Sequence, residues 1–445
     1  MYNLLFPNPG HFHAGLTLRV ADPRLNPDIY VYAQEGPELA DFLALVEAFN
    51  TRAEAPTNWR PHVYTGDDYF TRMIEERKGE LVLLAGKNDR KMAEIRALHE
   101  AGLHVLADKP WVMGPQSLDD LRAAMTGGPL VMDIMTERHE VTLVMLRQML
   151  ASDAVFGGFA ATGDTPALEV DTTHQLYKTV NGKVLVRYPW YFDIALQGDG
   201  IVDVPTHLVD QVQWLLGGMA GNDGAYDYGR DVELLSARRW ATELDAEAYA
   251  RITREGAFPA GMAGHVRDGL LHCPCNGAIN YRLRGVPVRV RSFWGLTTTP
   301  TADDYHLVCR GRRAEIVLDH GAHADSGRSV VVRPAPGEAA TVRAGLEALV
   351  AGWQADYPGT ALAGTGIASD GTGEALEVTV PAVHLIGHEE HFSMVLEEFL
   401  DFVERGAWPD SLAPDIITKY TLLAQAQQMA EGTEWDDHPE KGGAR

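Results

Sequence analysis

The chain has 445 residues, of which 45% are hydrophobic and 22% are charged, and its formal net charge at pH 7 is −24. This length fits two globular domains, and no apolar stretch approaches the roughly 18 residues of a membrane span, so we expect no membrane partner. The acidic balance argues against a nucleic-acid partner, because phosphate binding needs a basic surface, although a pocket can be locally positive for a small anion.

The first segment, MYNLLFPNPGHFHAG, has neither a basic leader nor a long apolar run. We interpret it as the first strand of the fold and not as a signal peptide, and we therefore expect a cytoplasmic protein.

Residues 1 to about 125 alternate short apolar strand patterns with helix patterns. Short strands separated by helices predict parallel pairing with both faces of the sheet covered, so this part is predicted to be a doubly wound α/β domain. The expected strands are YNLLF (2–6), DIYVYA (28–33), ELVLLAG (80–86) and LHVLA (103–107). The expected helices are PELADFLALVEAFNTRA (37–53) and DRKMAEIRALHEAG (89–102), the second ending at Gly102.

The pattern of predicted elements changes in the second half. Residues 130–150 are expected to form a strand that leads into a linking helix. Later β-rich runs lack regular helices between them, which predicts a large, mostly antiparallel sheet in a domain spanning 126–445. These runs are 154–163, 232–242, 278–285, 286–295, 305–311, 314–321 and 329–334. Helices are expected at 204–218, 391–406 and 414–431, and the Gly-, Ala- and Thr-rich stretch 334–383 is treated as an elaboration of this domain.

Two segments carry candidate chemistry. Lys109 follows the strand 103–107, and ligands of parallel sheets bind beyond the carboxyl ends of the strands, although a solvated lysine is the simpler interpretation. Pro205 is suited to the first turn of a helix on which Asp203, His207 and Asp210 would share one face with Trp214. A histidine between two carboxylates can handle protons, but it can equally belong to a capped helix start.

Neither the helix that carries His207 nor the HCPC segment predicts a metal site. His207 has no partner in an HxH or HxxxH pattern within its helix. Cys273 and Cys275 occur with His272 in HCPC, which is too close for an ordinary disulfide and is interpreted as a turn at a sheet edge. We therefore expect no bound metal.

Together, HVLADKP (104–110) and GDGIVDVPTHLVDQVQWLL (198–216) resemble the motifs of the Gfo/Idh/MocA oxidoreductases. The hallmarks of that family are an E-K-P tripeptide after a Rossmann strand and a G-G-x-x-x-D-x-x-x-H-x-x-D stretch in the second domain. The order of the motifs and their separation of about 95 residues also agree. The resemblance covers 1–220 well, the later sheet loosely and 334–383 not at all.

The resemblance implies an N-terminal Rossmann domain (1–125) and a C-terminal domain (126–445) whose open sheet forms contacts in a homo-oligomer, a dimer or tetramer. It implies NAD or NADP as cofactor and a sugar, glycoside or cyclitol as substrate, oxidised or reduced at one carbon. Lys109 would polarise or position the reacting oxygen, His207 would be the acid/base, and Asp203 would lie near both. The segment PWYFD (189–193) is similar to a W-x-x-D segment of the family beside the substrate.

The cofactor loop departs from the family's G-x-G-x-x-G. In FPNPGHFHAG, Gly10 matches a glycine of the motif, Asn8 replaces the first glycine and His13 replaces the third. Two interpretations of the histidines stay open: His11 and His13 contact the pyrophosphate or the substrate, or they are surface residues at the start of a helix. Glu35 would repel a 2′-phosphate and favour NAD. Lys87 replaces a proline of the family pattern and faces either phosphate or solvent, while Asp108 replaces a glutamate. The implied cofactor contacts are Asn8, Gly10, His11, His13, Gln34, Glu35, Ala85, Asn88, Lys109 and Pro110.

Several side chains are candidates for contacts with the sugar. For Arg138, His174, Lys178 and Trp190, a purely structural role is the alternative interpretation. The implied substrate contacts are Lys109, Arg138, His174, Lys178, Trp190, Asp203 and His207. Two other functions stay open. A tightly held NAD could serve a redox-neutral glycosidase or lyase, which would not accumulate NADH. A sensor of sugars or nucleotides could have lost catalysis, although the joint presence of Lys109, Asp203 and His207 speaks against it.

Overall fold

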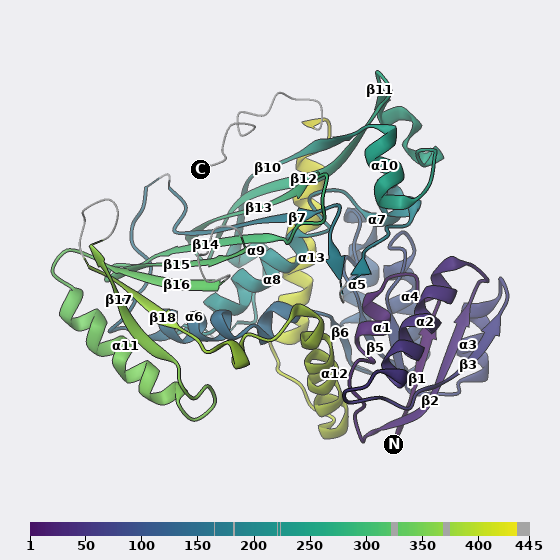
Figure 1. Cartoon of the computed structure of the whole chain (residues 1–445), viewed down its shortest axis with the longest axis horizontal. Coiled ribbons are helices and arrows are strands. Elements are labelled where there is room, and N and C mark those ends of the chain that lie inside the picture. The colour runs from purple at the N-terminus through teal and green to yellow at the C-terminus, as the bar shows by residue number, and fades with distance from the viewer. Residues whose placement is uncertain are drawn as a thin grey trace. The chain divides into compact units, whose positions relative to one another are not determined.

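The computed structural model describes residues 1–163, 165–180, 183–219, 221–222, 224–321, 328–367 and 374–433. The chain forms two compact units, and Figure 1 labels their elements. The first unit comprises Met1–His139 and Ile386–Tyr420, and the second comprises Glu140–Leu385 and the chain from Thr421 onward. In the part of the chain that the structure describes, no helix is both long and apolar enough to span a membrane.

The first unit is built on a six-stranded parallel sheet with the order β3-β2-β1-β4-β5-β6. This is the strand order of a dinucleotide-binding Rossmann fold, whose switch point lies between β1 and β4. The central strands are apolar and buried on both faces, as a parallel sheet covered by helices requires. The strands are β1 (Tyr2–Pro7), β2 (Leu25–Ala33), β3 (Arg60–Thr65), β4 (Leu81–Leu84), β5 (His104–Ala107) and β6 (Val131–Asp133).

Helices of the first unit begin and end where local chemistry favours it. Pro37 occupies the first turn of α2, and α4 is followed by Gly102 at a φ of 76°. The helices are α1 (His13–Leu16), α2 (Pro37–Thr51), α3 (Tyr69–Glu76), α4 (Lys91–Glu100), α5 (Leu118–Ala124) and α12 (His388–Arg405), with the start of α13 (Leu412–Met429) and the 3-10 turns η1 (Pro115–Ser117) and η2 (Thr136–His139).

The boundaries of this unit differ from those expected. The strand β6 pairs with β5, so 126–139 continue the first sheet beyond residue 125. The helix α12 also belongs to the first unit, where it packs on α1 and β5, although it lies about 250 residues further along the chain. The strand β3 and the helix α3 were not predicted, because β3 is a largely exposed edge strand with the mixed sequence RPHVYT.

The second unit contains a ten-stranded sheet of order β10-β12-β13-β7-β14-β15-β16-β18-β17, with β11 paired to β12. The strands β13 and β7 pair in parallel, and the other neighbours in this order pair antiparallel, so the mostly antiparallel sheet is confirmed. The strands are β7 (Leu168–Gln175), β10 (Val232–Leu244), β11 (Val266–Arg267), β12 (Leu270–Leu283), β13 (Val286–Gly295), β14 (Asp304–Arg310), β15 (Ala314–His320), β16 (Arg328–Pro334), β17 (Ala361–Ile367) and β18 (Glu374–Thr379). A separate two-stranded ribbon joins β8 (Thr179–Val180) to β9 (Lys183–Val184).

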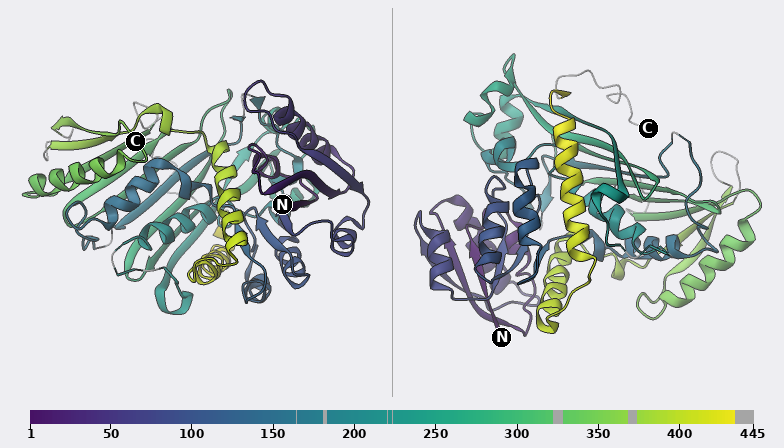
Figure 2. Two further views of the ribbon diagram at one scale, coloured as in Figure 1. Left: turned by 90° about the horizontal axis from the view of Figure 1, so that it is seen from below. Right: turned by 180° about the vertical axis from the view of Figure 1, so that it is seen from behind.

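Two helices of the second unit, α6 and α8, lie along one face of this sheet. Figure 2 shows α6 and α8 beside the strands, and α8 packs against both α6 and β13. The apolar side chains Leu208, Val212 and Leu215 of α8 are buried, as its sequence pattern indicates. The helices are α6 (Val141–Ala151), α7 (Ile194–Gln197), α8 (Pro205–Leu216), α9 (Tyr228–Asp231), α10 (Ala246–Thr253), α11 (Ala339–Trp353) and the end of α13, with the 3-10 turns η3 (Pro189–Phe192), η4 (Ala260–His265) and η6 (Ala382–His384).

Three expectations for this half were wrong or incomplete. The run 154–163 is not a strand but a loop with one isolated bridge, because Gly157 and Gly158 take positive φ values of 69° and 80°. The HCPC segment lies inside β12 and not in an edge turn. The stretch 334–383 adds α11 and the paired strands β17 and β18 to one edge of the sheet, with 368–373 outside the described residues.

Candidate active site

The loop after β1 is held tightly against the end of β4 at the switch point of the first sheet. The backbone N–H groups of Gly10 and His11 donate to the carbonyl oxygen of Ala85 at 3.0 and 3.2 Å. Asn8 has a φ of 42°, the left-handed conformation that its glycine-like place in the motif suggested. A Cβ on Gly86 would lie 2.9 Å from the Asn8 carbonyl oxygen, so glycine is needed for this close approach.

Two histidines from this loop meet a carboxylate from the end of β5. His11 Nδ1 lies 3.3 Å from Asp108 Oδ2, and His13 Nδ1 lies 3.0 Å from Asp108 Oδ1. Burial by itself would raise the pKa of Asp108, but the nearby His13 and His11 hold that pKa well below its usual value. Burial lowers the pKa of His11 well below its usual value, and His13 adds to the effect. The pKa values of both groups are therefore lowered, that of His11 by its burial and that of Asp108, against the effect of its burial, by the neighbouring histidines.

His13 is bulky for the place of a packing glycine, and the structure shows how it is accommodated. Its ring lies 4.6 Å from that of Phe392 on α12 and 4.0 Å from that of His11, centroid to centroid. The side chain is buried, and so is Phe392. His13 is therefore a buried residue that joins α1 to Asp108, and not a surface residue at a helix start.

Lys109 stands directly beyond the carboxyl end of β5, as predicted, and its backbone N–H donates to Asp108 Oδ1 at 2.8 Å. The Lys109–Pro110 peptide bond is cis. The next residue, Trp111, is buried and stacks on Tyr420 with ring centroids 5.3 Å apart. This packing fixes the start of the loop that follows the catalytic candidate Lys109 in the sequence.

The remaining cofactor candidates lie at the same edge of the sheet. Gln34 and Glu35 follow β2 and are exposed, and the Gln34 backbone N–H donates to Asn8 Oδ1 at 3.3 Å. Asn88 is buried after β4, whereas Lys87 is exposed. Sequence reasoning missed Lys91, which is fully buried and donates from Nζ to Asn88 Oδ1 at 2.5 Å; its position three residues after Asn88, at the start of a helix, was the available signal.

In the second unit, Asp203 lines a small pocket. The helix α8 begins at Pro205, and its N-cap residue Val204 makes no side-chain cap hydrogen bond. Asp203 Oδ1 accepts from Gln197 Nε2 at 3.3 Å. The pocket is lined by Leu176, Tyr191, Phe192, Gln197, Gly198, Asp199, Asp203, Cys273, Cys275 and Trp294.

Close backbone contact positions the turn before α8 on β12. Gly200 N–H donates to the Pro274 carbonyl oxygen at 2.9 Å. A Cβ on Gly200 would lie 2.1 Å from the Asn276 carbonyl oxygen, and one on Gly277 would lie 2.1 Å from that of Gly200. The two glycines therefore allow the turn that carries Asp203 to lie directly on the sheet.

Tyr191 also lines this pocket; it belongs to the segment PWYFD, which was expected beside the substrate, but its own role was not predicted. Burial raises the pKa of Tyr191 well above its usual value, and the nearby Asp203 carboxylate adds to the effect. The Arg187 guanidinium lies over the rings of Tyr191 and Trp294, at 4.5 and 4.9 Å from their centroids. Trp190 is buried against Tyr188 and is not among the residues that line this pocket.

The structure also places the other candidate residues of the second unit. His207 lies in the first turn of α8 and is half-buried, while Asp210 one turn later is buried. Lys178 Nζ lies 2.6 Å from Asp303 Oδ2. Burial alone would raise the pKa of Asp303, but His174 and Lys178 lower it to about 2. His174 and Lys178 thus share one carboxylate as a polar cluster.

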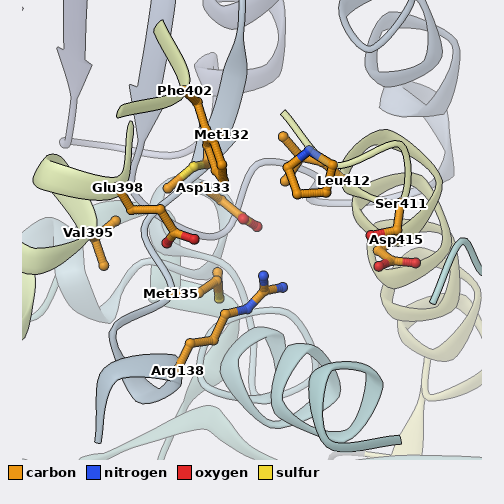
Figure 3. A pocket seen from close by; sticks show the side chains of 11 residues that line it. Met132, Asp133, Met135, Arg138, Val395, Glu398, Phe402, Ser411, Leu412 and Asp415 are labelled. Carbon is orange, nitrogen blue, oxygen red and sulfur yellow. The ribbon is translucent and has the colours of Figure 1, made fainter. Parts of the chain in front are cut away.

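Arg138 lies in a different pocket, within the first unit. Figure 3 shows its guanidinium among carboxylates from α12 and the start of α13. The lining includes Asp133, Glu398 and Asp415, and Asp133 forms a buried ion pair with Lys419 at 2.6 Å. The role of Arg138 as a substrate contact remains a prediction, and none of the other predicted substrate contacts, all of them among the described residues, lines this pocket.

Comparisons with known proteins place the chain in a family. The family model described as "Putative oxidoreductase C terminal domain" matches residues 145–431. A solved structure of an oxidoreductase from Parabacteroides merdae, itself described as putative, is 36% identical, with 96% of this chain and 97% of that chain covered and a TM-score of 0.88. No curated protein sequence matches the chain.

More distant structures share the fold alone. A levoglucosan dehydrogenase in complex with NADH and levoglucosan is 14% identical, with 98% and 99% of the two chains covered and a TM-score of 0.58. A 3-ketoreductase from Actinomadura kijaniata in complex with NADP and TDP-benzene is also 14% identical, with 96% and 97% covered and a TM-score of 0.56. On the family match and the Parabacteroides merdae relative, the chain belongs to the oxidoreductase family defined by this C-terminal domain.

Proposed function

We propose that the protein is an NAD(P)-dependent oxidoreductase that transfers hydride between its cofactor and a secondary hydroxyl or keto carbon of a sugar, glycoside or cyclitol. The observation that carries the proposal is the β3-β2-β1-β4-β5-β6 order with a close-packed turn at its switch point. NADH and NADP are named in complexes of proteins that share the fold. The family assignment supports redox chemistry independently.

The residues at the switch point fit a dinucleotide. Gly86 lets the loop after β1 pack closely on the end of β4, and a tight glycine turn of this kind brings the backbone of a Rossmann loop to the pyrophosphate. Gln34 and Glu35 follow β2, where the ribose is read in this fold, and the carboxylate of Glu35 favours NAD over NADP by charge repulsion. When bound, the nicotinamide supplies the acceptor or donor of the hydride.

The roles of the protein groups follow from the charges that develop. As a carbinol carbon loses hydride, its oxygen must lose a proton, and an ammonium within hydrogen-bond reach stabilises the negative charge on that oxygen. We assign this role to Lys109 and the transfer of the hydroxyl proton to His207, with Asp203 orienting the substrate. In reduction, His207 returns the proton to the oxygen.

The Asp203 pocket has room for about one water molecule and not for a sugar ring, so we propose it only as one wall of the substrate site. It combines the rings of Tyr191 and Trp294 with the polar groups of Gln197 and Asp203. Aromatic faces with a few directed hydrogen-bonding groups are typical of small-molecule sites that recognise orientation. Levoglucosan is the sugar named for one protein of the same fold.

We also propose a cytoplasmic homo-oligomer that associates through the face of the large sheet opposite α8. A hollow on the sheet is lined by arginines and aromatic rings, among them Arg238, Arg291, Trp240 and Phe293. Arginine and aromatic side chains are enriched at protein interfaces. Light scattering after size exclusion tests the proposal, and a monomer at micromolar concentration would contradict it.

A pair of variants tests the function. We expect Lys109→Ala to lower kcat by about two to three powers of ten with sugar or polyol substrates, since it removes the group that stabilises the developing charge. Arg122→Ala, which removes an exposed cation from α5 of the same unit, is the control and should stay near wild type. Near-normal turnover of Lys109→Ala would contradict the mechanism, and turnover without accumulation of NADH would indicate a redox-neutral glycosidase or lyase.

A further inference from the structure

We propose that His11, His13 and Asp108 form a binding site for one divalent transition-metal ion, for which Zn²⁺ is the natural probe. The donor atoms offered by these three side chains all lie within 4.8 Å of one another. His11 lies in the loop after β1, His13 is the first residue of α1, and Asp108 directly follows β5, so the site joins segments about 95 residues apart. The inference does not depend on the proposed dehydrogenase function.

The separations between donor atoms suit a single ion. Zn–N and Zn–O bonds of about 2.0–2.2 Å place neighbouring ligand atoms about 3.0 Å apart at octahedral angles and about 3.4 Å apart at tetrahedral angles. The observed pairs, His11 Nδ1 to Asp108 Oδ2 and His13 Nδ1 to Asp108 Oδ1, are separated by 3.3 and 3.0 Å. These two distances involve different oxygens of Asp108, and the donor set as a whole lies within 4.8 Å, so the side chains would shift to place all three donors on one ion. Binding through His11 Nδ1 would also replace the long hydrogen bond, 3.5 Å, that this atom accepts from the His13 backbone N–H.

The donor set indicates the class of metal. Imidazole nitrogens favour Zn²⁺, Fe²⁺, Co²⁺ and Ni²⁺, whereas Mg²⁺ and Ca²⁺ prefer sites made of oxygen atoms. Three protein ligands leave at least one position for water or a further ligand. The side chains are sheltered, with exposed fractions of 15% for His11, 11% for His13 and 4% for Asp108, so few waters compete for them.

Neighbouring groups fix the three ligands, as outer-shell partners do in metal sites. The loop that carries His11 is tied to Ala85 by two backbone hydrogen bonds. The ring of His13 packs on Phe392, and Asp108 Oδ1 accepts from the Lys109 backbone N–H. A bound ion would thereby clamp the loop after β1 to the segment that carries Lys109.

The competing interpretation is a cluster of histidine–aspartate hydrogen bonds without an ion. Lys91, buried close by, favours that alternative, because its positive charge acts on both His11 and Asp108 and would oppose a cation. Its Nζ is directed to Asn88 Oδ1 at 2.5 Å. The two interpretations differ in a measurable quantity, which is the stoichiometry of metal on the folded full-length chain.

The experiment loads the full-length protein with Zn²⁺ or Co²⁺ after chelator treatment, dialyses it, and measures bound metal by mass spectrometry. We expect about one ion per wild-type chain, and at least a tenfold weaker affinity in His11→Ala, His13→Ala and Asp108→Asn. The matched control is His62→Ala, which removes the histidine of an exposed pair with Asp28 (2.8 Å) in the same unit. The control should retain the ion.

The wild-type protein tests the site by itself if a variant fails to fold. X-ray absorption of the Zn²⁺-loaded wild type should show nitrogen and oxygen ligands with the scattering of two imidazoles. A wild-type chain that retains less than about a tenth of an ion, or variants that bind as tightly as His62→Ala, would overturn the site. Sulfur ligands would also overturn it, since cysteines and not these three side chains would then hold the ion. None of these readouts requires enzyme activity or bound nucleotide.

Discussion

The turn at the switch point of the first sheet can be tested by adding one methyl group. In Gly86→Ala the new Cβ would lie 2.9 Å from the Asn8 carbonyl oxygen and 3.5 Å from the backbone nitrogen of Gly10. Ordinary carbon–oxygen contacts are a few tenths of an ångström longer, and backbone atoms cannot move aside as a flexible side chain can. Such overpacking typically costs about 1–3 kcal/mol, and here the strain displaces the loop that we assign to the pyrophosphate.

We therefore expect Gly86→Ala to weaken the affinity for NAD(P)H by about five- to 150-fold, the equivalent of about 1–3 kcal/mol, if the strain is relieved by moving the loop. Titration of nicotinamide fluorescence measures the affinity, and thermal unfolding measures how much of the strain appears as lost stability. The matched control is Gly352→Ala in α11, where a Cβ would meet no atom within 4 Å. Unchanged affinity and an unchanged Tm in Gly86→Ala would refute the assignment of this turn.

Three further predictions concern other parts of the chain. His306→Gln should reduce the free energy of unfolding most at low pH, because the hydrogen bond to Asp319 raises the pKa of His306 in the folded state. The stabilisation is complete below the unfolded-state pKa of about 6.5 and is lost as the pH rises through the folded-state pKa. Urea unfolding at several pH values would show this dependence. Glu35→Gln should raise the affinity for NADPH relative to NADH, measured by paired titrations, and an unchanged ratio would count against Glu35 as the ribose-reading residue. Trp111→Ala should destabilise the first unit by about 3–5 kcal/mol, because it removes a buried ring stacked on Tyr420, and urea unfolding with a shift below 1 kcal/mol would contradict this.

Elements with strong hydrophobic periodicity were predictable. The buried strands β4 and β5 and the helix α8 appear in the sequence as short apolar runs and as an i, i+3, i+4 pattern. The edge strand β3 was not, because an exposed strand can alternate polar and apolar residues without a clear period. The joining of α12 to the first unit was also hidden, since it depends on contacts between residues far apart in the sequence, such as His13 with Phe392.

In the candidate site, too, features set by local sequence were predictable, whereas contacts between distant segments were not. The position of Lys109 beyond β5 and the left-handed turn at Asn8 follow from local rules on strand ends and backbone conformation. The contacts of Asp108 with His11 and His13 do not, because they depend on the parallel neighbours β1, β4 and β5 lying side by side. Tyr191 was missed for a similar reason: its proximity to Asp203 arises from the fold and not from sequence spacing.

The identity of the bound nucleotide tests the proposed function most directly. The purified protein is denatured, both as isolated and after equilibration with excess NAD and NADP followed by rapid desalting, and the released small molecules are identified by mass spectrometry. We predict a nicotinamide nucleotide at up to one molecule per chain, with NAD in excess of NADP because of Glu35. The absence of any nicotinamide nucleotide from both preparations, together with no saturable change in NADH fluorescence on titration, would contradict the proposal.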